Sequence, residues 1–176
     1  MAHDIIEVTV AVDGDTAYSP NDVLFQMTEV PLPARACKIV DAYFEGAAPG
    51  VQNHLISLYF FKSNTGGELG PLNSAANITA DNFASNKFIG SVQLLSDSDS
   101  ALENVVPTML VARRINGLAG STGATFGGGT NDMVLKGDVD YDGPTQHGVY
   151  VSGLNVVGIP DFVSDKNCKV ILHVEY

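Results

Sequence analysis

The sequence predicts an all-β protein, a jelly-roll-like antiparallel β-sandwich of about eight to nine strands with at most one short helix. Three observations support this fold. Apolar and polar residues alternate with a period of two in most segments, 18 glycines and eight prolines supply frequent turns, and a helical pattern is nearly absent. Because 176 residues can bury a sizeable core, residues 1–176 are predicted to form one domain.

The strands follow from short apolar segments bounded by turn residues. Residues 5–12 show the pattern clearly, because Ile6, Val8 and Val10 alternate with polar neighbours. This first strand, within residues 1–12, is also a candidate N-terminal arm. The remaining strands are expected at 23–28, 38–44, 54–61, 88–95, 104–112, 132–139, 148–157 and 168–176.

One short helical turn is expected at residues 79–84. Thr79 is suited to the N-cap position, because its hydroxyl can accept a hydrogen bond from a backbone N–H of the first turn. Asp81 would lie in that first turn, near the positive end of the helix dipole.

The most apolar run of the chain, residues 54–61, is predicted to be a central strand. Ile56, Leu58 and Phe60 share one face, which we expect to point into the core. The opposite face also needs a cover, supplied either by loops or by a neighbouring subunit. Its apolar residues are therefore the candidates for a subunit interface: Leu55, Tyr59 and Phe61.

The segment before this strand, residues 38–44, alternates with Val40, Ala42 and Phe44 in the inward positions. Turn residues at 45–50 separate it from the central strand. The two segments are therefore expected to pair as an antiparallel hairpin.

The charge of the chain excludes some partners. Its formal net charge is −11 and it has no basic cluster, so we expect no nucleic-acid partner. No apolar run is long enough to span a membrane, and we expect no membrane partner. The first residues lack the basic and apolar regions of a signal peptide, so synthesis in a cytoplasm is expected.

One acidic stretch has the spacing that begins a calcium loop. Asp138, Asp140 and Asp142 alternate before Gly143, but Val149 stands where the loop would need a bidentate glutamate. An acidic turn between strands is the favoured interpretation, and we expect no metal and no cofactor.

Neither the histidines nor the cysteines indicate a catalytic centre. His3, His54, His147 and His173 lack the spacing of metal ligands. Cys37 and Cys168 are expected as buried, reduced thiols, although a disulfide is conceivable if their strands are neighbours. No nucleophile elbow or zinc helix occurs, so the chain is not expected to be an enzyme and has no candidate catalytic residues.

Four segments, in chain order, resemble the head decoration (cement) proteins of tailed bacteriophages, of the jelly-roll type. Residues 18–23, Tyr-Ser-Pro-Asn-Asp-Val, look like the family's lead into its first sheet strand. The second is the pair of segments 38–44 and 55–61, which ends in the apolar strand and polar turn at 58–64. The third is the short helix and Ile-Gly strand at 78–83 and 88–92, and the fourth is the strand at 148–151 with 163–165 before a closing strand.

The resemblance implies a structural virion protein that forms a homotrimer on the outer surface of an icosahedral capsid. Such trimers join neighbouring major capsid proteins and stabilise the shell, so the implied partners are the major capsid protein and the chain itself. The alternative is a carbohydrate- or host-surface-binding β-sandwich module of a virion. A calcium-dependent adhesin-like sandwich is a third interpretation.

Overall fold

The computed structural model describes residues 1–46, 54–95, 110–114, 133–137, 147–157, 162 and 168–176. For residues 110–114 it describes the backbone alone. The elements in chain order are β1 (His3–Val10), β2 (Val23–Leu32), β3 (Ala36–Gly46), β4 (Leu55–Phe61), α1 (Ala80–Ser85), β5 (Phe88–Leu95), β6 (Leu110–Arg114), β7 (Val134–Lys136), β8 (His147–Val157) and β9 (Cys168–Glu175).

The strands follow the order β1-β9-β3-β6-β5-β4-β8-β2, with β7 paired to β3. This path folds into two antiparallel four-stranded sheets, β1-β9-β3-β6 and β5-β4-β8-β2, which pack face to face. Strand β1 pairs with β9, β2 with β8, β3 with β6 and β4 with β5. This wrapping of the first half of the chain against the second is the jelly-roll arrangement, so the predicted fold class is confirmed.

The expected hairpin between residues 38–44 and 54–61 is wrong. Strand β3 pairs with β9, β6 and β7, whereas β4 pairs with β5 and β8 in the other sheet. Strands that follow one another usually pair, but here the chain passes from one sheet to the other between β3 and β4.

The core lies between the two sheets. As predicted, Ile56, Leu58 and Phe60 point into it, each with at most 1% of its surface exposed. The ring of Phe25 stacks on Phe44 from the opposite sheet, with 6.1 Å between ring centroids. Such interlocking of large side chains from two sheets holds the sandwich together.

Strand β3 contains a β-bulge that the sequence pattern did not reveal. Ile39 pairs with Val174 and Asp41 with His173, so Val40 is an additional residue in the ladder. Ile39 is consequently buried, while 46% of the Val40 surface is exposed. The inward position predicted for Val40 is therefore wrong, because the extra residue reverses the alternation.

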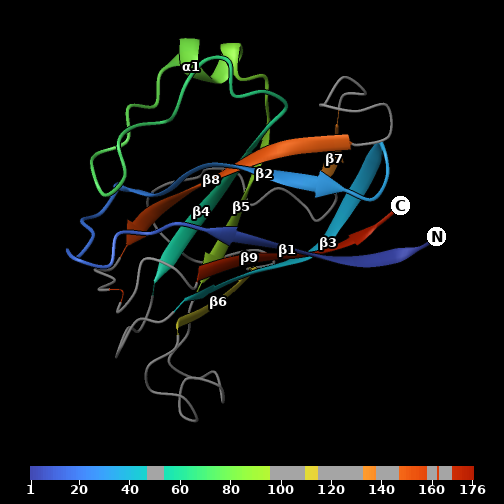
Figure 1. The fold of residues 1–176 in the computed structure, drawn as a ribbon, viewed down its shortest axis with the longest axis horizontal. Coiled ribbons are helices and arrows are strands. Elements are labelled where there is room, and N and C mark those ends of the chain that lie inside the picture. The colour runs from blue at the N-terminus through green and yellow to red at the C-terminus, as the bar shows by residue number, and fades with distance from the viewer. Residues whose placement is uncertain (47–53, 96–109, 115–132, 138–146, 158–161, 163–167) are drawn as a thin grey trace, which may run out of the picture.

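Strand β1 is an integral part of its sheet. All eight of its residues are in register with β9, and Ile6, Val8 and Val10 are buried in the core. Backbone hydrogen bonds between Ala2 and Tyr176 extend the ladder, so the two ends of the chain lie side by side (Figure 1). Residues 3–10 thus form a core strand rather than a detached arm.

Candidate functional site

The three residues predicted for a subunit interface lie on the outer face of the β5-β4-β8-β2 sheet. Phe61 has no exposed surface, while Tyr59 and Leu55 are partly buried. Phe61 packs in a second apolar cluster with Val23, Leu69 and Leu154, separate from the central core. Part of this outer face is therefore already covered within a single chain.

The covering segment is the connection from β4 to β5, residues 62–87, called here the 62–87 cover. Figure 1 shows α1 and its flanking loops on the far side of β2 and β8 from β1 and β9. As predicted, Thr79 caps α1 by accepting a hydrogen bond from the Asn82 N–H. Backbone bonds from Val23 to Ser74 and from Asn73 to Val23 attach the cover to β2.

Asn86 holds the two ends of the 62–87 cover together. This residue is fully buried. Its side-chain oxygen accepts from the Gly66 N–H at 2.7 Å, and its amide donates to the Gly67 carbonyl at 2.8 Å. Its backbone carbonyl also accepts from the Ser63 N–H. These bonds satisfy polar groups that would otherwise be costly to bury.

Aromatic rings fill the space between the 62–87 cover and the sheet. Phe83 of α1 contacts Tyr59, Phe61 and Phe88, with ring centroids 4.6–5.8 Å apart. Burial raises the pKa of Tyr59, and a hydrogen bond with Ser57 opposes the shift. The cover over Phe61 is thus supplied by the chain's own loops, which was one of the two alternatives for this face.

Leu55 lies at the opposite end of the same face from Phe61. It is in register with Leu95 of β5 and with Val157 of β8. Val157 has 51% of its surface exposed. The structure thus places Leu55, Tyr59 and Phe61 on one face of the sheet, but the three residues differ in what surrounds them.

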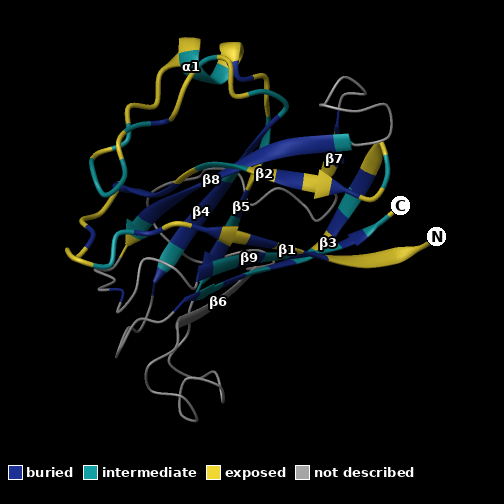
Figure 2. Ribbon diagram, in the orientation of Figure 1, coloured by how far each residue is buried: buried dark blue, intermediate teal, exposed yellow. Residues whose placement is uncertain are grey.

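The outer face of the other sheet is more open. We call it the β1–β9–β3 face and define it by its outward side chains: His3, Ile5, Glu7, Val40, Tyr43, Ile171 and His173. Ile5 is opposite His173 in the ladder, and Glu7 is opposite Ile171. Ile5 and Val40 expose 57% and 46% of their surfaces. Figure 2 shows the N-terminal half of β1 as exposed.

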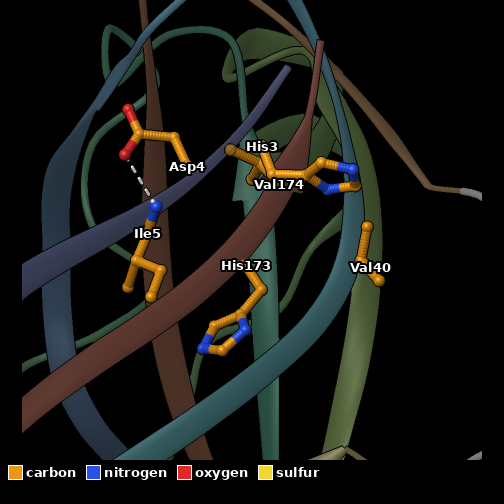
Figure 3. Close-up of a pocket in the computed structure, with 6 residues that line it drawn as sticks. All are labelled: His3, Asp4, Ile5, Val40, His173 and Val174. Carbon is orange, nitrogen blue, oxygen red and sulfur yellow. Dashed lines mark hydrogen bonds between the residues drawn. The ribbon is translucent and has the colours of Figure 1, made fainter. Parts of the chain in front are cut away.

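A shallow hollow of about 490 Å³ lies on this side of the molecule. It is lined by His3, Asp4, Ile5, Val40, His173 and Val174. Figure 3 shows that these residues come from β1, β3 and β9, with the Asp4 carboxylate accepting a hydrogen bond from the Ile5 N–H. The bulge at Val40 contributes an apolar wall to the hollow.

Three acidic side chains on or next to the β1–β9–β3 face, Glu7, Asp41 and Glu175, each lie close to a nitrogen or hydroxyl group. Lys169 Nζ lies 2.8 Å from Glu7 Oε2, and this hydrogen bond raises the pKa of Lys169. His3 Nδ1 lies 3.6 Å from Glu175 Oε1. The Tyr43 hydroxyl donates to the Asp41 carboxylate at 2.6 Å, and the Tyr43 ring contacts His173. Of these three contacts, only the one between Glu7 and Lys169 joins opposite charges, because the Tyr43 hydroxyl is neutral and the imidazole of His3 is charged only when it is protonated.

His54 lies in the interior, immediately before β4, and has no exposed surface. Burial lowers its pKa to about 4, although hydrogen bonds with Asn155 and with the Val157 backbone oppose this shift. The Asn155 amide in turn donates to the Ser19 carbonyl at 2.9 Å. These polar groups connect β4 and β8 to the segment that precedes β2.

The remaining sequence candidates do not meet at a site. Asp138, Asp140 and Asp142 lie outside the described residues. Cys37 and Cys168 are buried at opposite ends of the β3–β9 ladder, about eight residues or roughly 26 Å apart, and no disulfide joins them. Among the residues that the structure describes, no group of three or more potential ligands is placed to hold a metal ion.

The sequence analysis did not predict the β1–β9–β3 face as a contact surface, although the sequence contains a signal for it. Ile5 and Ile171 occupy outward positions in otherwise alternating strands, where polar residues are expected. The outward position of Val40 could not have been predicted from the sequence, because only the bulge in β3 places this residue on the face.

Comparison of the chain with protein-family models, with curated protein sequences and with solved structures finds no match. In the part of the chain that is described, α1 is too short to cross a membrane, and no helix has the length and apolar character to do so.

Proposed function

We propose that this chain is a structural virion protein that decorates the outside of an icosahedral phage capsid. In this proposal it acts as a homotrimer and joins neighbouring major capsid proteins. It carries out no catalysis and needs no cofactor.

The observation that carries the proposal is the strand order of the two sheets. The pairing of β1 with β9, β2 with β8, β3 with β6 and β4 with β5 is the jelly-roll order, which viral capsid domains use repeatedly. Because one fold serves several functions, the surfaces must also be considered. The 62–87 cover seals much of one sheet, while the β1–β9–β3 face remains available for contact.

A trimer that bridges capsid proteins can stabilise a shell with modest contacts at each site. Linked contacts act at a high effective concentration, so several weak contacts together give tight binding. The net charge of −11 is consistent with a protein that stays soluble at high concentration until it is assembled.

The test is reconstitution on shells that lack the protein. The purified chain is first measured by size-exclusion chromatography with light scattering and is then added to empty and expanded shells. Electron microscopy is expected to show added density at three-fold or quasi-three-fold positions of the lattice. Shells that remain bare at saturating protein would refute the proposal.

The jelly roll also occurs in lectins, which keeps the carbohydrate-binding module as the second candidate. Phe88, with 40% of its surface exposed beside Phe83, is the aromatic side chain at which a sugar ring would stack. A monomer that binds glycans, and loses that binding in Phe88→Ala, would favour this function over capsid decoration.

A further inference from the structure

We propose that two acidic side chains, Asp4 and Glu68, prevent the edges of the sandwich from adding a strand of another copy of the chain. Each carboxylate accepts a hydrogen bond from a backbone N–H of a terminal strand. That contact keeps the strand from pairing with a second molecule. This role does not depend on the proposed function.

Strands β1 and β2 are the two ends of the strand order. Within the described residues, β1 forms a ladder with β9 alone and β2 forms one with β8 alone, apart from two isolated bridges between the start of β2 and the 62–87 cover. A terminal strand presents backbone N–H and C=O groups that can pair with a strand of another molecule. Both strands are therefore places at which copies of the chain could join through their backbones.

On β1, the hydrogen bonds at the chain ends show which way each N–H points. Ala2 and Tyr176 exchange both of their backbone hydrogen bonds and so form a hydrogen-bonded pair of the antiparallel ladder. Such pairs alternate with non-hydrogen-bonded pairs, so Ile5 forms a non-hydrogen-bonded pair with His173 and its N–H points away from β9. The Asp4 carboxylate accepts from this N–H at 2.8 Å (Figure 3). Asp4 thus occupies a donor that an added strand would need.

On β2, three features close the edge in succession. At its start, the Val23 N–H donates to the Ser74 carbonyl of the 62–87 cover. Further along, the Met27 N–H donates to the Glu68 carboxylate at 2.6 Å, where the register is shifted and no residue of β8 is paired with Met27. Near the end of the strand, Pro31 has no N–H to offer. Covering loops, charged side chains and prolines are the means by which edge strands avoid pairing between molecules.

The exposure of the two carboxylates separates this role from a role in the core. Asp4 and Glu68 are both exposed, so neither bond is required to satisfy a buried group. An incoming strand, however, would have to replace a charge-assisted hydrogen bond and remove water from the carboxylate. Both costs oppose strand addition at β1 and at β2.

The test compares three forms of the full chain: the wild type, the double variant Asp4→Ala with Glu68→Ala, and the control Asp4→Asn with Glu68→Gln. The control loses the same two negative charges, but its side-chain amide oxygens can still accept from the two N–H groups. Size-exclusion chromatography with light scattering is expected to show the wild type and the control at the same mass. The alanine variant is expected to gain mass with concentration, in multiples of the chain mass of 18.5 kDa.

An alanine variant that keeps the wild-type mass at every concentration overturns the proposal. A control that associates as strongly as the alanine variant also overturns it, because the loss of charge alone would explain the association. Pairing through the edges should slow amide hydrogen exchange in β1 or β2, and association without such slowing would count against these edges. If circular dichroism shows that the double variant is unfolded, the single variants Asp4→Ala and Glu68→Ala decide the question. The mass of the wild type and its binding to shells test capsid decoration separately.

Discussion

Gly153 in β8 is expected to be intolerant of a side chain. A Cβ atom built on Gly153 would overlap Cε1 of Phe25 and lie 2.6 Å from its Cδ1 and 2.8 Å from its Cζ. The ring cannot easily move, because it is fully buried and stacked on Phe44. Gly153→Ala must therefore distort the core between the two sheets.

The size of the effect follows from two opposing contributions. Overpacking a dense core costs up to about 3 kcal/mol, whereas replacing glycine by alanine within a strand regains roughly 0.5–1 kcal/mol. The expected net loss is about 2 kcal/mol of unfolding free energy. For a chain of this size, that corresponds to a decrease in Tm of about 4–8 °C.

Urea and thermal unfolding, followed by circular dichroism, measure this loss. The decisive comparison is Gly153→Ala in a Phe25→Leu background, where the shorter side chain leaves room for the new methyl group. There the substitution is expected to be nearly neutral, which gives a coupling of about 2 kcal/mol between the two positions. Ser91→Ala, at an exposed position of β5, is the control. An equal loss in both backgrounds would refute the overlap with the Phe25 ring.

Three further predictions concern other parts of the molecule. His54 has a folded pKa of about 4 against an ordinary 6.5, so its stabilising contribution is complete above pH 6.5 and is lost as the pH falls towards 4. Relative to the wild type, His54→Gln should remove on the order of 3 kcal/mol of pH-dependent stability in this window. Urea unfolding at each pH measures the difference. Parallel pH profiles of unfolding free energy for the variant and the wild type would contradict this prediction. Asn86→Ala removes both side-chain hydrogen bonds of this buried residue and should cost about 2–3 kcal/mol, with faster proteolysis within the 62–87 cover. Asn64→Ala, at an exposed position, should stay within about 0.5 kcal/mol. Cys37 and Cys168 should resist a thiol reagent in the folded protein and both react in denaturant; rapid labelling of the native chain would argue against their burial.

Local patterns predicted the elements well, because each depends on neighbouring residues. The alternation of Ile6, Val8 and Val10 determines both the strand and its inward face. Thr79 caps α1 because the cap bond is formed within three residues. The inward side of β4 also followed directly from its period of two.

The errors arose where distant segments decide the outcome. Val40 faces outward because the ladder with β9 contains an extra residue, and no local pattern encodes that register. The pairing of β3 with β9 rather than β4 depends on strands more than a hundred residues apart. For the same reason, the cover over Phe61 could be named only as one of two alternatives.

The pairing order also has a consequence for how the chain folds during its synthesis. Strand β1 needs β9 and β2 needs β8, so residues near the two ends must meet before either sheet is complete. A nascent chain that stops before residue 168 lacks the neighbour of both β1 and β3, which leaves strand edges and apolar side chains open to water. Folding should therefore be slow and should wait until β9 has been synthesised, as is usual when most contacts are distant in sequence.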